Sequence, residues 1–550
     1  MQLKTDVLVI GAGGAGMYAA LAAAARGASV LLVDKNLVGR GGATVMAQMT
    51  VAAALGEAEP DRWEDHLADT LEAGRGLCDE ALAAHLCEQA PHVMREMDDW
   101  GVGWARSGNS ISQVHAPGHG VKRCCYVDFL NTGPAVAGTL RKRVGKTANI
   151  RKVSDLQVVD LIVNDGQVFG ATALHTVDGS TITIAAKATV IATGGLTKLY
   201  SRSSASSNMG GQGFALALRA GAELTDMEFV QFFPIGHLAP RMVGMDPIMW
   251  DPFRYKLGGR LLNGQYEEFI DRYGSQDDGN YRVTRDVATY AIMREVEAGR
   301  GSPAGGAYLS FTHISEQALR DAFGPVIDRI AKNGIDLTKD PVEVSPIAHY
   351  HMGGVRVDST MATCVPGLFA AGEAVGGAGG ANRLSGNAIT EALVFGKTAG
   401  ESAADFAKNV ALPSALDASE YREEGRSADT PSATFRLREL REMMWRDVGP
   451  FRTAERLESA LAWISKVQSE QAGAPQGAGA FANELVDWHD LQAALTVAES
   501  IAAAALAREE SRGAHQRDDF PHLSDEPPFR QNIAMANGHV TVQAQLVGSV

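Results

Sequence analysis

The stretch DVLVIGAGGAG, residues 6–16, decides the fold. Its first half is a continuous apolar run, which is typical of a strand buried on both faces of a parallel sheet. The run leads directly into GAGGAG, where Gly11, Gly13 and Gly16 have the spacing G-x-G-x-x-G. An alanine-rich segment, residues 14–26, follows and predicts a helix. Strand, glycine turn and helix together predict a site where the backbone approaches a pyrophosphate closely.

A second strand, SVLLVD at 29–34, completes a strand–helix–strand unit, and Asp34 at its end is placed to hold a ribose hydroxyl. Two later segments extend the nucleotide domain. TVIATGG (189–195) is a strand that ends in small residues, and VPGLFAAGEAVGG (365–377) carries Glu373 after a glycine. A nucleotide domain that returns so late in the chain is typical of the two-part FAD domain of flavoprotein oxidoreductases, and it favours FAD over NAD.

Composition narrows the class of protein. The chain has 550 residues, which exceeds one hydrophobic core and predicts two to four domains. Its net charge of −15 (50 basic against 65 acidic residues) argues against a nucleic-acid partner. The five cysteines have no CxxC spacing, which argues against a disulfide framework, a zinc site or an iron–sulfur cluster and favours reduced thiols.

The N-terminal part shows no signal-peptide pattern. The apolar segment 15–34 is interrupted by Arg26 and Gly27, so it is too short to span a membrane. We therefore expect a cytoplasmic enzyme that is not an integral membrane protein.

The chain changes character several times. Helical patterns are expected over 60–100, strands over 150–195, and loops with few periodic runs in an inserted domain. The expected segments are a first FAD-binding part (1–235), an inserted domain (236–345), a second FAD-binding part (346–412), a linker (413–431), a helical domain (432–510) and a polar tail that wraps the surface (511–550).

One cation stands out in the loop AGGANRLSGNAITE, residues 378–391. Arg383 is surrounded there by small residues and precedes a predicted helix. Glycines let backbone approach a ligand, a helix N-terminus favours an anion, and a guanidinium can clamp a carboxylate with two hydrogen bonds. The alternative is an ordinary solvated surface arginine.

Nine segments, in order along nearly the whole chain, carry a specific resemblance. They are RWEDHLADTL, HGVKRCCYVD, DMEFVQFFPIG, GGRLLN, TRDVATYAIMREVEAGRG, AHYHMGG, PGLFAAGEA, GANRLSGNAITEALVFGKTAG and SRGAHQRDDFP. The chain resembles the flavoprotein subunits of the succinate dehydrogenase/fumarate reductase family, which includes L-aspartate oxidase and adenylylsulfate reductase. The resemblance implies an α/β fold with a two-part Rossmann-like FAD-binding domain, an inserted α+β capping domain and a C-terminal helical domain.

The resemblance also implies a reaction. In such enzymes the substrate lies between the flavin and the capping domain, and hydride passes between flavin N5 and a carbon beside a carboxylate. Arg285 matches the arginine that acts as general acid or base, His349 a substrate-binding histidine, and Arg383 the carboxylate clamp. Because arginine stays protonated in proteins, Arg285 suits proton donation in a reduction better than proton removal. His351 is either a substrate contact or a packed loop histidine.

The resemblance, together with the glycine motifs, predicts a set of FAD-binding residues. They are Gly11, Gly13, Gly14, Gly16, Asp34, Lys35, Gly41, Gly42, Ala43, Thr44, Gln48, Thr193, Gly194, Glu373, Ser385, Asn387, Ala388 and Ile389.

Two departures from the family pattern predict the chemistry. Covalent family members attach FAD to a histidine, and Ala43 in GGATVMAQMT (41–50) stands at that place, so we expect non-covalent FAD and a bias toward reducing an alkene. Phe233 in QFFPIG replaces a histidine that holds the far carboxylate of succinate or fumarate, and Arg254 is a candidate for a different polar group there. A mono-carboxylate, or a dicarboxylate with a larger or different substituent, fits better than plain succinate or fumarate.

Three functional hypotheses follow. The leading one is a soluble FAD-dependent dehydrogenase or reductase that acts on a CH–CH or C=C bond beside a carboxylate. The second is an amino acid oxidase similar to L-aspartate oxidase, and the third an FAD-binding electron-transfer subunit that needs an iron–sulfur or ferredoxin-like partner. A homo-oligomer is compatible with all three, and the sequence leaves the substrate, the direction and the electron carrier open.

Overall fold

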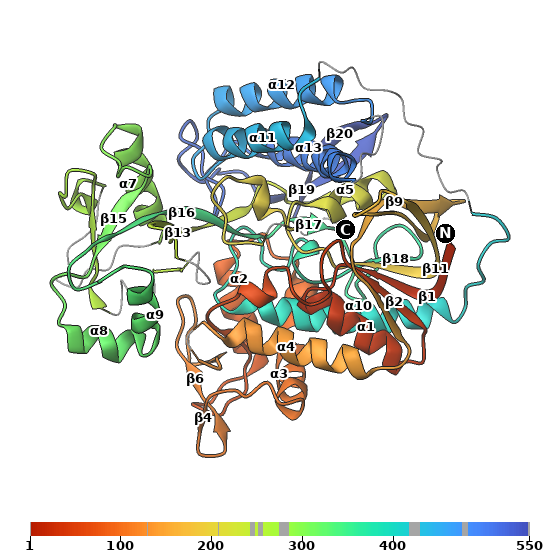
Figure 1. The fold of residues 1–550 in the computed structure, drawn as a ribbon, viewed down its shortest axis with the longest axis horizontal. Helices are drawn as coiled ribbons and strands as arrows, with labels where there is room; N and C mark the ends of the chain where they lie inside the picture. The colour runs from red at the N-terminus through yellow and green to blue at the C-terminus, as the bar shows by residue number, and fades with distance from the viewer. Residues whose placement is uncertain are drawn as a thin grey trace. The chain divides into compact units, whose positions relative to one another are not determined.

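The computed structural model of the chain forms two compact units, which are connected through two strands (Figure 1). The first unit comprises Met1–Ser201, Ala205–Val230 and Tyr350–Val550, and the second comprises Arg202–Ser204 and Gln231–His349. The residues that the structure describes are 2–128, 130–206, 208–242, 248–250, 257–273, 285–416, 430–475 and 482–547.

A seven-stranded sheet organises the first unit. Its strands are β1 (Gln2–Ile10), β2 (Val30–Val33), β8 (Ile150–Val153), β9 (Leu156–Asn164), β10 (Gln167–His175), β11 (Thr181–Ile191) and β18 (Leu368–Ala370). The order is β8-β2-β1-β11-β10-β9, and β18 pairs with β11. The β1–β2, β1–β11, β2–β8 and β11–β18 pairs are parallel. The sheet therefore receives a strand from far along the chain, as the glycine segment at 365–377 predicts.

Helix α1 (Gly14–Ala25) packs against helix α10 (Asn387–Ala407) through backbone. A Cβ on Gly400 would lie 2.2 Å from the carbonyl oxygen of Ala19, so only glycine allows this approach. Gly396, one turn earlier, contacts α1 in the same way. The alanine-rich sequence of α1 and the two glycines of α10 thus join the two halves of the nucleotide-binding domain.

The predicted helical stretch at 60–100 is two helices, and the side chain of Asp79 caps the second by accepting from the amide of Leu82 at 3.1 Å. The helices are α2 (Trp63–Ala73), α3 (Glu80–Asp99), α4 (Thr132–Lys146) and α5 (Gln212–Arg219), with the 3-10 turns η1 (Thr44–Met46), η2 (Thr197–Leu199) and η4 (Gly372–Ala374). The short strands are β3 (Val51–Ala52), β4 (Arg106–Ser107), β5 (Ser110–Ile111), β6 (Gln113–Val114) and β7 (Cys124–Cys125).

Three helices form the helical region of the first unit: α11 (Ala433–Asp447), α12 (Ala454–Glu470) and α13 (Asn483–Ala507) (Figure 1). Ser432 and Thr453 cap the first two with their side chains, which accept from the backbone amides of Phe435 and Arg456. α13 is long and apolar enough to cross a membrane by composition alone, but 61% of its most apolar window is buried inside the protein. Its apolar sequence is therefore accounted for by packing in the interior.

The last segment differs from the expected surface tail. β19 (Phe529–Ala536) and β20 (His539–Leu546) form a hairpin that joins β12 (Leu224–Thr225) and β17 (Gly354–Val355) in a four-stranded sheet. His515 is fully buried and Arg517 is almost so. Residues 518–547 are mostly exposed or half-buried, so the segment combines a surface part with a buried start in which polar side chains have buried partners.

The second unit has its own antiparallel sheet, in the order β13-β16-β15-β14. Its elements are β13 (Val230–Ala239), β14 (Arg260–Leu262), β15 (Ala307–Ser310), β16 (Val342–His351), η3 (Ile270–Tyr273), α7 (Arg285–Glu297), α8 (Glu316–Phe323) and α9 (Val326–Lys332). β13 leaves the first unit and β16 returns to it. This unit is an insertion into the nucleotide-binding domain and contains more regular structure than its loop-rich sequence suggests.

Candidate active site

The glycine turn connects β1 to α1, and two of its glycines are required by the backbone itself. Gly11 has φ +99°, and a Cβ on it would lie 2.4 Å from the carbonyl oxygen of Ala192. A Cβ on Gly16 would lie 1.8 Å from the carbonyl oxygen of Gly11. Gly13 is different, because a Cβ there would meet no atom within 4 Å. Open space beside the N-terminus of α1 fits the pyrophosphate of a dinucleotide.

A second loop lies against this turn. The amide of Gly14 donates to Thr44 Oγ1 at 3.3 Å, and a Cβ on Gly14 would lie 2.6 Å from the same hydroxyl. Gly42, with φ +86°, donates its amide to Ser206 Oγ at 2.9 Å. Ala43 precedes the 3-10 turn that Thr44 begins. The structure therefore brings the predicted segment 41–48 to the predicted pyrophosphate turn.

Two further members of that segment are positioned by packing. A Cβ on Gly41 would lie 3.0 Å from Asn208 Nδ2, and Gln48 is 9% exposed. The backbone of the loop is thus packed on one side, which holds its residues in a defined conformation.

Asp34 ends β2, and its carboxylate accepts from the amides of Ala12 and Asn36, both at 2.8 Å. Burial raises the pKa of Asp34, while the two amides act in the opposite direction. The carboxylate is therefore fixed beside the glycine turn, where a ribose hydroxyl would bind. Lys35 turns to α13, with its Nζ 2.7 Å from Asp490 Oδ2.

Glu373 lies in η4 and joins three separated segments. It accepts from the amide of His351 at 3.2 Å, and a Cβ on Gly195 would lie 2.4 Å from Glu373 Oε1. Burial raises the pKa of Glu373 to about 8, so this carboxyl is protonated over much of the neutral range. Thr193 and Gly194 precede this contact, and Gly194 has φ +74°.

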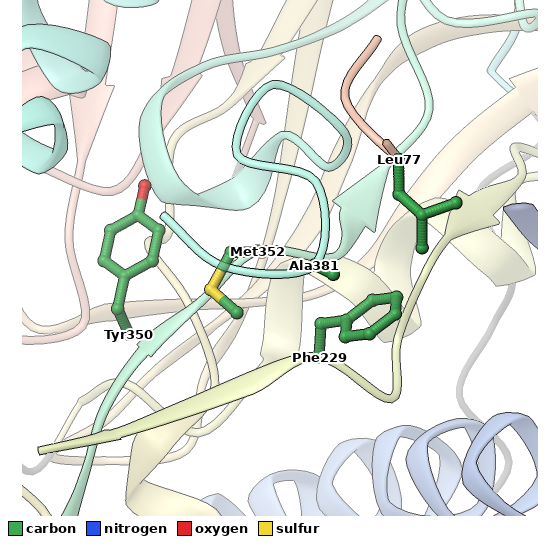
Figure 2. Close-up of a cluster of buried hydrophobic side chains, with 5 residues drawn as sticks. All are labelled: Leu77, Phe229, Tyr350, Met352 and Ala381. Carbon is green, nitrogen blue, oxygen red and sulfur yellow. The ribbon is translucent and has the colours of Figure 1, made fainter. Parts of the chain in front are cut away.

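Arg383 is 8% exposed, so the solvated alternative is not what the structure shows. Its guanidinium lies over the ring of Tyr350, with Cζ 4.2 Å from the ring centroid, and Nη1 donates to the carbonyl of Leu384 at 3.1 Å. The Tyr350 hydroxyl is hydrogen-bonded to Glu391. Figure 2 shows Tyr350 in a cluster with Met352, and the other members are Leu77, Phe229 and Ala381. A buried cation with a fixed orientation is suited to bind a carboxylate.

The start of α10 carries four predicted FAD contacts: Ser385, Asn387, Ala388 and Ile389. Gly386 caps the helix with φ +86° and offers no side-chain cap. The amide side chain of Asn387 is engaged by His66 Nε2 at 2.9 Å and by Thr70 Oγ1 at 3.2 Å. These two contacts fix the orientation of the Asn387 side chain. The carbonyl of Ser385 lies 2.6 Å from His119 Nε2.

Sequence reasoning missed His66, His119, Tyr350 and Glu391. His66 and Thr70 lie one turn apart on the buried face of α2, and burial lowers the pKa of His66 to about 3. No short-range spacing relates these residues to the loop at 383–391, because they reach it only through tertiary contacts. The single usable signal was the i, i+4 placement of His66 and Thr70 in an amphipathic helix.

His351 packs inside the first unit. Its Nε2 lies 3.1 Å from the carbonyl of Met227, its ring contacts Phe214 edge-on at 5.5 Å, and its side chain is fully buried. Burial lowers the pKa of His351 to about 4, so the ring is neutral. These contacts support the packed-histidine alternative.

The second unit holds His349, whose Nδ1 lies 2.9 Å from Ser204 Oγ. The ring of Phe233 meets the imidazole edge-on, with 5.5 Å between centroids. Phe233 also packs with Met249 and Ile347 in one buried apolar cluster. One side of His349 is therefore apolar, where a family enzyme with histidine at 233 would be polar.

For two predicted site residues, the side chain falls on the part of the chain that the structure does not describe. Arg254 is outside the described residues. Arg285 is the first residue of α7, and its side chain is outside the described part of the chain. Within the described ranges, no group of three or more His, Cys, Asp or Glu side chains is placed to hold a metal ion.

A two-part nucleotide-binding sheet, a glycine turn open at Gly13 and a fixed buried arginine define an FAD-dependent oxidoreductase. Residues 6–389 match the FAD binding domain model, and residues 437–547 match the model described as fumarate reductase flavoprotein C-term. The chain belongs to the succinate dehydrogenase/fumarate reductase flavoprotein family.

Relatives of known family support this membership over nearly the whole length of the chain. One subunit of the fumarate reductase (CoM/CoB) of Methanothermobacter marburgensis is 35% identical over 97% of each chain. The L-aspartate oxidase of Streptomyces coelicolor is 32% identical over 97% of this chain and 91% of its own. The structure of Mycobacterium smegmatis Sdh1 in complex with UQ1 superposes with a TM-score of 0.89 and 32% identity, covering 99% of this chain and 94% of that one.

The predictions of the family, the α/β fold, the FAD cofactor and an oxidoreductase activity are thereby confirmed. The residue roles, the substrate and the covalent state of the flavin stay predictions.

Proposed function

We propose that the protein transfers hydride between FAD and a C–C bond next to a carboxylate, and that reduction of a C=C bond is the favoured direction. The observation that carries the proposal is Arg383, a buried guanidinium fixed over Tyr350 just before α10. A guanidinium held in this way loses little further rotamer entropy when it binds a carboxylate with two hydrogen bonds.

FAD, when bound, supplies the hydride-transfer chemistry. The glycine turn, the segment 41–48, Asp34 and the first turn of α10 would hold it. The fit rests on the open space at Gly13 and on the buried, oriented carboxylate of Asp34. Arg383 binds the carboxylate of the substrate, His349 orients it by hydrogen bonding, and Arg285 donates a proton to the carbon next to the one reduced.

We propose that the substrate is not plain fumarate or succinate. Phe233 packs with Met249 and Ile347, and the side chains of these three residues carry no hydrogen-bond donor for a second carboxylate. Burying a carboxylate against such a surface costs several kcal/mol. A mono-carboxylate, or a dicarboxylate with a larger apolar or differently charged end, avoids this cost.

We propose that FAD is bound without a covalent link, because Ala43 at the histidine position of covalent family members has no nucleophile. An iron–sulfur or ferredoxin-like partner supplies the electrons, since the five cysteines lack cluster spacing. All five are free thiols in the structure, which supports a reducing compartment and a cytoplasmic location.

An amino acid oxidase is the second candidate, favoured by the 32% identity to an L-aspartate oxidase. It differs from the first candidate in its acceptor. Hydrogen peroxide formed with an amino acid under air supports the oxidase, and its absence with rapid anaerobic alkene reduction supports the reductase. A protein that binds FAD without substrate chemistry, the third hypothesis, would show neither.

The test is anaerobic flavin reoxidation. The holoenzyme flavin is reduced chemically, and unsaturated carboxylates that include fumarate, crotonate and bulkier monoacids are added. One monoacid is expected to restore the oxidised-flavin absorbance rapidly, and Arg285→Ala and Arg383→Ala are expected to lose this reaction while retaining flavin. Arg320→Ala, at an exposed arginine of α8, is the matched control. Fumarate as the best oxidant would contradict the proposed substrate class, and unchanged rates in both arginine variants would contradict the site.

A further inference from the structure

We propose that Tyr350 and Glu391 are positioning residues for Arg383, and that Glu391 takes up a proton when a carboxylate binds there. The inference rests on the proposed function, because it takes Arg383 as the carboxylate clamp. Beyond that function, it states that carboxylate binding is coupled to the uptake of one proton, and it gives Tyr350 and Glu391 roles in this binding.

The geometry supports the first part of the proposal, the positioning of Arg383 by Tyr350 and Glu391. The Arg383 guanidinium lies over Tyr350 with Cζ 4.2 Å from the ring centroid, which is a close cation–π contact. The Tyr350 hydroxyl is hydrogen-bonded to Glu391, and this bond holds the outer end of the side chain in place beneath the guanidinium. Tyr350 is 5% exposed and Glu391 is 4% exposed. A chain of contacts thus runs from α10 through β16 to the guanidinium.

The charges around Glu391 support the second part of the proposal, the uptake of a proton. Among the residues that the structure describes, four titratable groups face Glu391: Tyr350, Arg383, Glu373 and Cys78. Burial raises the pKa of the Cys78 thiol to about 12 and raises the pKa of Tyr350 well above its ordinary value, so both are neutral near pH 7. One cation therefore faces two carboxyls in a buried region.

Burial raises the pKa of Glu391 to about 7 and that of Glu373 to about 8, while the Arg383 charge lowers both. The Arg383 charge stabilises the ionised form of Glu391. A carboxylate bound to Arg383 neutralises that charge, and the pKa of Glu391 rises. The balanced step is carboxylate anion plus ionised Glu391 plus one proton from water, giving bound carboxylate plus neutral Glu391.

The coupling of carboxylate binding to proton uptake predicts how the affinity changes with pH. Below the pKa of free Glu391 the proton is already present, and the affinity is independent of pH. Above it, each pH unit weakens binding by up to about tenfold, until the pKa of the complex is reached. Glu391→Gln keeps the hydrogen bond to Tyr350 and removes the titration.

The test uses oxidised holoenzyme with crotonate and fumarate as probes, and binding is followed by the flavin absorbance change. Calorimetry at pH 7.5 in phosphate and in Tris gives the number of protons taken up, and a net uptake is expected for the wild type. Glu391→Gln is expected to take up far fewer protons than the wild type and to show a weaker dependence of affinity on pH between pH 6.5 and 8, because only Glu373 still titrates. Glu401→Gln, at a partly exposed glutamate of α10, is expected to match the wild type.

Two tyrosine variants separate positioning from stability. Tyr350→Phe keeps the ring under the guanidinium and is expected to weaken binding about threefold, while Tyr350→Leu removes the stack and is expected to weaken it about tenfold or more. In turnover the loss is expected in KM rather than kcat, and FAD content reports whether each variant is folded.

The outcomes distinguish this inference from the proposed function. If Arg383→Ala binds the probes as the wild type does, the proposed clamp is wrong and this inference falls with it. If Arg383→Ala loses binding while Tyr350→Leu and Glu391→Gln keep wild-type affinity and proton uptake, only this inference is wrong. Uptake that persists in Glu391→Gln and disappears in Glu373→Gln would also overturn the assignment to Glu391.

Discussion

Glu228 and Arg508 form an ion pair in which Arg508 Nε lies 2.6 Å from Glu228 Oε1, and neither side chain exposes any area. Glu228 immediately precedes the chain's exit into the second unit, and Arg508 follows α13. The guanidinium also donates to Glu510 and to the carbonyl of Phe529. One buried cation therefore holds together the nucleotide-binding region, the helical region and the C-terminal hairpin.

Removal of this cation is expected to be costly. Arg508→Ala leaves the Glu228 carboxylate buried without its partner, and losses of about 3–5 kcal/mol are typical of such a change. Urea unfolding of the holoenzyme, followed by tryptophan fluorescence, measures the free energy of unfolding. Arg320→Ala on the exposed face of α8 is the control and is expected to unfold as the wild type does. Equal stability of the two variants would show that the pair is dispensable.

Much of the nucleotide-binding part could be predicted because its determinants are local. The apolar runs of β1 and β2, the glycine spacing and Asp34 each specify structure within a few residues. The buried ion pairs of the C-terminal segment could not be predicted, because Arg508 and Glu228 are 280 residues apart and look like surface charges in the sequence. The same holds for the contacts of Tyr350 with Arg383 and Glu391, because Tyr350 is more than 30 residues from both in the sequence.

Alanine is expected to have different effects at two glycines of the turn: it should prevent folding at Gly16 but weaken only FAD binding at Gly13. Gly16→Ala would place a methyl group 1.8 Å from the carbonyl of Gly11, so it is expected to disrupt the turn and lose both folding and FAD. Gly13→Ala meets no protein atom, so the apoprotein is expected to fold normally while its affinity for FAD falls about tenfold or more. Thermal unfolding of the apoprotein and FAD titration measure the two effects. Wild-type FAD affinity in Gly13→Ala would mean that the pyrophosphate does not bind at this turn.

The contact between α10 and α1 is expected to be intolerant of a single methyl group. Gly400→Ala places a Cβ 2.2 Å from the carbonyl of Ala19 and should destabilise the protein by about 1–3 kcal/mol or more. Gly138→Ala in α4 is the matched control, since a Cβ there meets nothing within 4 Å and alanine stabilises a helix interior by about 0.5–1 kcal/mol. The two variants are expected to shift the melting temperature in opposite directions, and a common direction would contradict the packing.

The raised pKa of Glu373 predicts a pH dependence of stability. The folded protein keeps this proton up to about pH 8, whereas the unfolded chain releases it near its ordinary value of 4.5. Between these values the folded state binds more protons, so stability decreases as the pH rises. Glu373→Gln cannot titrate, and its free energy of unfolding should fall less than that of the wild type between pH 5.5 and 7.5. Parallel curves for the two proteins would show that Glu373 is ionised in the folded state.

Phe233 offers a direct test of the proposed substrate class. Phe233→His places a hydrogen-bond donor in the apolar cluster with Met249 and Ile347, at the position where the succinate and fumarate enzymes carry histidine. A second carboxylate can then be paired, so the ratio of kcat/KM for fumarate to that for crotonate is expected to rise by at least about tenfold. Phe233→Leu keeps the apolar surface and is expected to leave this ratio close to that of the wild type. If the two variants change the ratio equally, the side chain at 233 does not select between mono- and dicarboxylates.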